Sequence, residues 1–175
     1  MKIKILYLLS LIALLYSCGG NPDAVIPDET VGKSTIVITG AISATLEYKA
    51  EFIGTISTAG DGISGYTINL GNTGQTESAL VFTLDELGNK QGFAPGTFNY
   101  TNDPNTTLAF WGIYTDANDT WTINPTASLT NKIVLNTITD TKVTGEFELN
   151  LESSTGGDKI KLVGTFEAVG VTIRS

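Results

Sequence analysis

The segment KVTGEFELNLESSTGGDKIKLVGTFEA, residues 142–168, decides the fold class. Apolar residues or glycine occupy every second position from Val143 to Leu151, and again from Ile160 to Ala168. A period of two with one apolar face is typical of half-buried antiparallel strands, and the Gly-Gly-Asp sequence at 156–158 supplies a turn. The segment therefore predicts a β-hairpin with one dry face.

The hydrophobic pattern also suggests the register of this hairpin. If Leu151 lies opposite Ile160, each phenylalanine lies over a glycine of the other strand and covers the backbone that glycine leaves bare. An attractive charge pair of ~0.2–1 kcal/mol falls on the outer face. The expected pairs are Leu151–Ile160, Leu149–Leu162, Phe147–Gly164, Gly145–Phe166, Val143–Ala168 and Glu152–Lys159. The alternative is that the glycines mark β-bulges and the register differs by two.

The preceding chain carries further short apolar runs separated by turn residues. The expected strands cover residues 36–56 (one bent strand or two joined by a turn), 66–70, 78–84, 95–100, 108–115, 120–124 and 132–138. Turns every 8–12 residues and no helix-period segment indicate an all-β fold. The sequence predicts an antiparallel β-sandwich, or a closed or partly closed barrel, of roughly nine or ten strands.

The first residues differ sharply from the rest. Lys2 and Lys4 precede an apolar run at 5–16, which is too short for the ~20 residues that span a bilayer and is typical of an export signal. The run ends in Leu-Tyr-Ser-Cys and is followed by two glycines, and this resembles a bacterial lipoprotein signal. The resemblance implies that residues 1–17 are removed and that Cys18 becomes the lipidated first residue. The alternative is an ordinary secretory signal that leaves a free thiol.

The expected mature chain divides into a tether and one domain. Residues 18–33 contain Gly-Gly-Asn-Pro, a second proline and no periodicity, which favours a flexible spacer, and residues 34–175 form the single β-domain. Loss of Lys2 and Lys4 with the signal leaves 8 basic against 18 acidic residues, a net charge of −10. Such acidity disfavours nucleic acid and direct adsorption to anionic lipid.

Three short motifs carry a second resemblance. Pro95-Gly-Thr-Phe98, Gly145-Glu-Phe147 and Gly164-Thr-Phe166 resemble the β-rich domain of uncharacterised lipoproteins from Bacteroidota and related bacteria. The resemblance covers about the last 80 residues of the chain. It implies a lipid-anchored protein of the bacterial cell envelope, with the outer membrane as the expected location, and it carries no activity with it.

The amino-acid composition excludes most types of catalytic site. The chain has no histidine, and its one cysteine is used by the signal, so Ser–His and Cys–His nucleophile pairs and thiolate or imidazole metal sites are excluded. A carboxylate-based hydrolase needs two acids facing each other across a cleft. The candidates Glu146, Glu148 and Glu152 share one strand face beside lysines, as in a solvated outer surface. We therefore expect a protein that is not an enzyme.

A polar turn offers the one candidate metal site. Asp116, Asn118 and Asp119 place three oxygen-bearing side chains in a four-residue turn, and Ca²⁺ prefers such ligands. The turn lacks the length and the glutamate of an EF-hand loop. The alternative is that Asp and Asn stand there because turns favour them.

Aromatic residues on the hairpin 108–124 are the candidate ligand-binding residues. A four-residue turn sets Tyr114 opposite Trp121 on one face, with core packing as the main expectation for the pair, and places Trp111 on the other face. An exposed tryptophan is suited to stacking on sugar rings or on a partner protein. We expect a binding module for a glycan or another extracellular ligand; the alternative is a structural or interaction subunit of an envelope complex.

Overall fold

The computed structural model describes residues 31–56, 63–71, 78–86, 93–101, 108–126 and 129–174, and all of its regular structure is β-strand. The strands are β1 Gly32–Gly40, β2 Ala44–Ile56, β3 Ile63–Gly71, β4 Ser78–Glu86, β5 Gly96–Asn99, β6 Leu108–Asp116, β7 Thr120–Ile123, β8 Lys132–Ile138, β9 Lys142–Ser153 and β10 Lys159–Arg174. The all-β class and the number of strands are confirmed. Within these residues no helix is able to cross a membrane.

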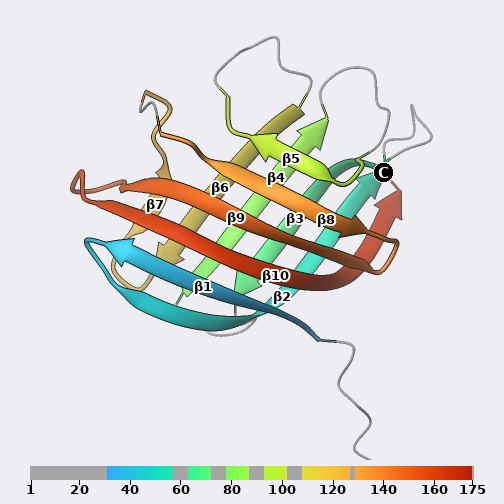
Figure 1. Ribbon diagram of the computed structural model, residues 1–175, viewed down its shortest axis with the longest axis horizontal. Coiled ribbons are helices and arrows are strands. Elements are labelled where there is room, and N and C mark those ends of the chain that lie inside the picture. Colours follow the sequence, from blue (N-terminus) through green and yellow to red (C-terminus); the bar gives the residue numbers. More distant parts are fainter. Residues whose placement is uncertain are drawn as a thin grey trace, which may run out of the picture.

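The strands form two crossing layers that are joined by hydrogen bonds (Figure 1). In the figure β1, β10, β9 and β8 run across the front, while β2, β3, β4 and β6 rise behind them at a steep angle. The pairings run in a ring through β1, β2, β3, β4, β6, β7, β9 and β10, and β8 and β5 extend the front layer from β9. The fold is thus a sandwich whose layers are linked in the manner of a partly closed barrel, as the sequence predicts.

The C-terminal hairpin has the predicted register. Leu151 pairs with Ile160, and Glu152 with Lys159. The glycines cause no bulge in this pairing, because Phe147 lies opposite Gly164 and Phe166 opposite Gly145. The dry face is confirmed by the burial of alternate residues from Val143 to Leu151 and of Ile160, Leu162, Phe166 and Ala168.

The N-terminal strand is inserted between two others. Ile36 of β1 pairs with Leu46 of β2 on one side and with Gly164 of β10 on the other. At the Gly32 end of β1, the ladder continues with β2 and β10 paired directly and in parallel. A Cβ at Gly32 would collide with the Ala50 carbonyl oxygen, so only glycine fits where the three strands meet.

The structure distinguishes the two alternatives for the alternating run at 36–56. The alternating run at 36–56 is two strands joined by a turn at 41–43, and the turn keeps the same parity buried on both sides. Strand β1 begins at Gly32, two residues before the expected start of the β-domain, and Gly32 and Lys33 belong to the ladders between β1 and its neighbours.

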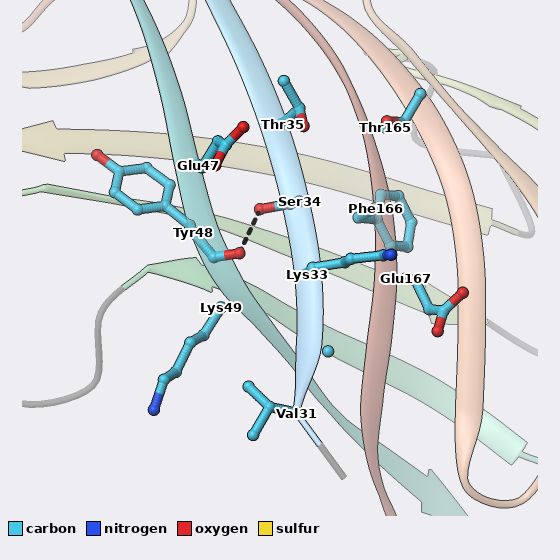
Figure 2. A pocket seen from close by; sticks show the side chains of 11 residues that line it. Val31, Lys33, Ser34, Thr35, Glu47, Tyr48, Lys49, Thr165, Phe166 and Glu167 are labelled. Atoms are coloured by element: carbon cyan, nitrogen blue, oxygen red, sulfur yellow. Dashed lines mark hydrogen bonds between the residues drawn. The ribbon is translucent and has the colours of Figure 1, made fainter. Parts of the chain in front are cut away.

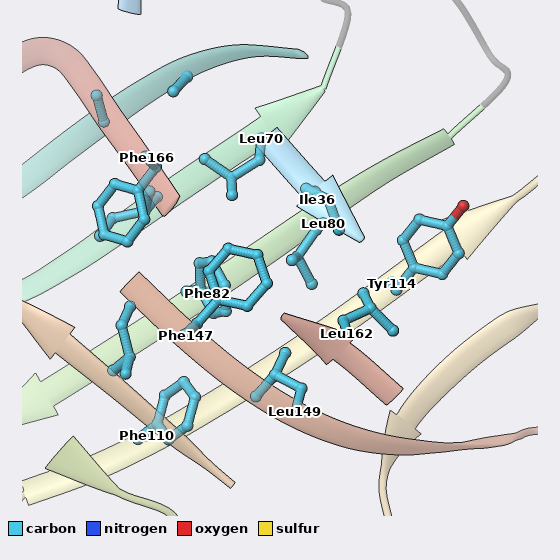
Figure 3. Close-up of a cluster of buried hydrophobic side chains, with 14 of the residues drawn as sticks. Ile36, Leu70, Leu80, Phe82, Phe110, Tyr114, Phe147, Leu149, Leu162 and Phe166 are labelled. Atoms are coloured by element: carbon cyan, nitrogen blue, oxygen red, sulfur yellow. The ribbon is translucent and has the colours of Figure 1, made fainter. Parts of the chain in front are cut away.

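The core lies between the two layers and is built from their inward-facing residues (Figure 3). Phe82 of β4 meets Phe147 of β9 with ring centroids 5.0 Å apart, and meets Phe166 of β10 at 6.2 Å. Complete burial of such a side chain contributes about 1.5–3 kcal/mol. With one cysteine in the whole sequence, this packing between layers carries the stability that disulfides supply in many exported domains.

Candidate functional site

The three candidate aromatic residues lie on opposite faces of the sheet. Tyr114 pairs with Trp121 as predicted, and both are in the core, at 3% and 5% exposed. Trp111 is on the outer face of β6 and is 38% exposed. A ligand on the protein surface therefore contacts Trp111 and does not reach the rings of Tyr114 and Trp121.

Tyr100 lies against Trp111 and is the residue that sequence reasoning missed. The ring centroids are 5.6 Å apart and the ring planes are inclined by 59°. Tyr100 follows β5 directly, and its backbone N–H donates to the Asn131 carbonyl oxygen at 2.8 Å, which fixes the chain beside β8. Partial burial raises the pKa of the Tyr100 phenol. The two rings thus come from separate strands and form one aromatic surface.

Polar side chains continue this surface across the back layer. Thr83 of β4 lies opposite Trp111, and Thr67 of β3 lies opposite Thr83. Asp85 lies opposite Gly65, and its Oδ1 is 2.8 Å from where a Cβ on Gly65 would be, so the missing side chain makes room for the carboxylate.

We call the surface formed by Trp111, Tyr100, Thr83, Thr67 and Asp85 the Trp111 face. Neighbouring strands are about 4.8 Å apart, so Thr67 and Thr83 follow one another across it at that spacing, and Asp85 lies two residues further along β4. An aromatic surface next to hydrogen-bonding oxygens can stack on the apolar face of a ring while binding its hydroxyl groups.

The candidate calcium turn has another role in the structure. The Asp116 Oδ1 accepts the backbone N–H groups of Asn118 at 2.8 Å and of Asp119 at 2.9 Å, which is the usual geometry of an aspartate that closes a turn. The side chain of Asn118 is exposed.

Asp119 joins this turn to the turn between β9 and β10. Its Oδ1 accepts from the Thr120 N–H at 2.7 Å and the Ser154 hydroxyl at 3.1 Å, and its Oδ2 accepts from the Ser153 hydroxyl and from the Thr155 hydroxyl at 3.0 Å. The hydrogen bond from Ser153 is the main reason why the pKa of Asp119 is lowered.

Both oxygens of Asp119 are thus used by donors of the chain itself. In the part of the chain that the structure describes, no group of three or more His, Cys, Asp or Glu residues is placed to hold a metal ion. These contacts favour the turn interpretation of Asp116, Asn118 and Asp119 over a calcium site.

The candidate hydrolase carboxylates lie side by side on an open sheet face. Glu148 is within 2.6 Å of the Lys161 Nζ and 3.6 Å of the Lys132 Nζ, and the hydrogen bond from Lys161 is the main cause of its lowered pKa. Glu146 is exposed on the same strand. A carboxyl with a lowered pKa is a poor general acid, and a pair on one strand cannot face each other across a cleft.

Glu152 corrects one detail of the predicted hairpin. Its register partner is Lys159, but among the described side chains Glu152 accepts instead from the Asn124 Nδ2 at 2.5 Å. Asn124 comes from the loop after β7, so a residue distant in sequence replaces the expected cross-strand ion pair.

The export signal, Cys18 and residues 18–30 of the expected tether lie outside the described residues. Comparison with known proteins gave no match: no family model, no curated protein and no solved structure matches the chain.

Proposed function

We propose that this chain is a lipid-anchored protein of the bacterial cell envelope whose β-domain is a non-enzymatic binding module for a glycan. The observation that carries the proposal is the exposed Trp111 ring, which lies against Tyr100 and beside Thr83 and Asp85 on the outer face of the sheet. The anchor is the lipid on Cys18, which the signal-like N-terminus supports.

A glycan suits the Trp111 face better than a wholly apolar ligand. A sugar ring has an apolar C–H face that stacks on indole, and hydroxyl groups at its edge that need partners. Thr83 and Asp85 supply such partners beside the ring, and both are on the same outer face of β4. Since this surface is not enclosed by opposing carboxylates, binding without hydrolysis is the function that it supports.

The test is glycan binding by the full chain and by Trp111→Ala. We expect the wild type to bind at least one class of glycan in a panel of polysaccharides and peptidoglycan fragments. The variant should bind that glycan at least tenfold more weakly, with an unchanged melting temperature. Thr115→Ala is a matched control, since Thr115 is also exposed on β6. Equal binding by Trp111→Ala and the wild type would remove the Trp111 face from the site.

A structural or interaction subunit is the second candidate, since an exposed tryptophan is also typical of the centre of protein interfaces. In that case no glycan binds. A pull-down from envelope extracts recovers one stoichiometric partner with the wild type and loses it with Trp111→Ala.

The anchor has its own test. Cells grown with labelled palmitate should incorporate label into the wild-type chain and not into Cys18→Ser. A wild-type chain without label would refute lipidation and leave the binding experiment unaffected.

A further inference from the structure

Four exposed aliphatic side chains gather at one corner of the domain. Val31 is 37% exposed, Ile53 49%, Val171 58% and Ile173 49%. Val171 pairs with Ile53 in the parallel ladder between β10 and β2, and Ile173 is the next outward residue of β10. Val31, Ile53 and Val171 line a groove of about 380 Å³. We call these four residues the aliphatic corner.

This exposure is not required by the fold. The inward-facing residues of the same two strands, such as Phe52, already fill the core, and strands tolerate threonine or lysine on an outer face. Adjacent exposed aliphatic residues on a soluble domain usually mark a surface that something else covers.

Two lysines on the rim of the corner are placed directly opposite each other. Lys33 of β1 pairs with Lys49 of β2, and like charges in this position destabilise a sheet. Figure 2 shows Lys49 reaching toward the end of the strands where Val31 lies, while Lys33 leans toward Glu167. Glu167 makes its ion pair with Lys142, at 2.8 Å.

Acidic and basic side chains are balanced around the corner. Glu51 lies opposite Val169 on the same groove, and Glu47 and Glu167 line the neighbouring pocket together with Lys33 and Lys49. Lys33, Lys49 and Lys142 equal these three carboxylates in number, so the surroundings of the corner are less acidic than the whole sequence, which has a net charge of −8.

The position of Val31 indicates what covers the corner. Val31 is both a member of the corner and the first described residue, so the chain from Cys18 reaches the domain at this surface. The 13 residue steps from Cys18 to Val31 span at most about 45 Å, which keeps the corner close to any bilayer that holds a lipid on Cys18.

We propose that the aliphatic corner is the membrane-facing surface of the domain. Val31, Ile53, Val171 and Ile173 enter the headgroup region of the bilayer, and the ammonium groups of Lys33 and Lys49 meet lipid phosphates. The inference rests on the proposed anchor at Cys18. The acidic net charge limits adsorption of an unanchored chain, whereas the lipid raises the effective concentration of bilayer at the corner.

The experiment uses the full lipidated chain in vesicles of phosphatidylethanolamine and phosphatidylglycerol. Because Cys18 then has no free thiol, a single introduced cysteine carries the only nitroxide label. Labels on Val171→Cys and Ile53→Cys should be more accessible to oxygen than to a water-soluble nickel chelate. A label on Thr115→Cys, exposed on β6, should show the reverse preference.

A variant with a charge in the aliphatic corner provides a second test. In the Ile53→Asp background, the label on Val171→Cys should change to the aqueous preference while the chain still floats with the vesicles. If the Val171 label is as accessible to the chelate as the Thr115 label in the wild-type background, the inference is wrong although the anchor holds. A chain that carries no lipid and does not float refutes the anchor instead.

Discussion

The ring of Phe166 lies over the bare backbone of Gly145. A Cβ added to Gly145 would lie 2.7 Å from the Phe166 Cζ and would collide with the Val134 carbonyl oxygen. Phe147 and Gly164 repeat the arrangement on the other strand, with 2.6 Å between the Phe147 Cζ and the corresponding Cβ position. Each aromatic ring thus packs against a strand partner that has no side chain.

This packing predicts that Gly145→Ala destabilises the domain by about 1–3 kcal/mol, because a backbone oxygen and a buried ring leave the new methyl group no space. The midpoint of urea denaturation measures the effect. Gly156→Ala is the matched control, since its Cβ would meet only the Ser153 Oγ at 3.7 Å. Equal midpoints for the two variants would show that the ring does not occupy this space.

The two tryptophans should differ sharply in stability experiments. Trp121 is buried at 5% exposure, so Trp121→Ala should cost about 3–5 kcal/mol. Trp111 is 38% exposed, and Trp111→Ala should cost less than about 1 kcal/mol. Thermal melts of the two variants provide the comparison. A large loss with Trp111→Ala would mean that its ring supports the fold rather than a ligand.

Asn131 should be required for the loop before β8. It is 3% exposed, and its Oδ1 accepts the Asn150 N–H at 2.5 Å. Asn131→Leu leaves that N–H buried without an acceptor, at a cost of about 1–3 kcal/mol in the free energy of unfolding. Asn136→Ala, at an exposed position of β8, is the control and should be neutral. Similar losses in the two variants would contradict this assignment.

Asp119 should contribute to stability at neutral pH and lose that contribution in acid. Hydroxyl donors lower the pKa of Asp119 in the folded state. Its contribution to the free energy of unfolding is therefore fully present above the pKa of the unfolded state, about 3.9, and is lost as the pH falls through the pKa of the folded state. An NMR titration of the carboxyl groups measures both values.

The Ser153→Ala variant tests the cause of that shift. It removes the main donor and should raise the pKa of Asp119 toward its ordinary value. Glu148, whose pKa depends on Lys161, should titrate as in the wild type. If the Asp119 pKa stays unchanged in Ser153→Ala, the Ser153 hydroxyl is not the cause.

Calcium should leave the melting temperature unchanged, because the Asp116 Oδ1 and both carboxylate oxygens of Asp119 already accept hydrogen bonds from the chain. The measurement is a thermal melt with added calcium and with a chelator. A ligand at 100 times its dissociation constant adds about 2.7 kcal/mol, which such a melt detects as a shift of several degrees. A shift of that size would restore the cation site at this turn.

The alternation of apolar and polar residues in the sequence predicted much of this fold. In residues 142–168 the pattern predicted the strands, the dry face and the register, since a slip by one residue would expose Phe147 and Phe166. The length of one turn predicted that Tyr114 and Trp121 lie opposite each other. These are local relationships, within one hairpin each.

Relationships between distant segments could not be read in the same way. Alternation assigns a residue to a face of its strand but does not name the neighbouring strand, so the insertion of β1 between β2 and β10 was not predictable. For the same reason the sequence did not predict the contact of Tyr100 with Trp111 or the hydroxyl donors around Asp119. It also did not predict that Glu152 accepts a hydrogen bond from Asn124 instead of pairing with Lys159. Each depends on which loops meet after folding.

The position of β1 has a mechanical consequence. This strand is paired with β2 from Gly32 to Ile38 and with β10 from Lys33 to Gly40, and the chain from Cys18 joins it at Val31. A force that pulls the domain away from a fixed N-terminus acts along the axis of β1 and loads both ladders in shear. Many hydrogen bonds must then break together rather than one after another, so forced unfolding has a high barrier and is slow. The strand nearest the proposed anchor is thus held on both sides against tension.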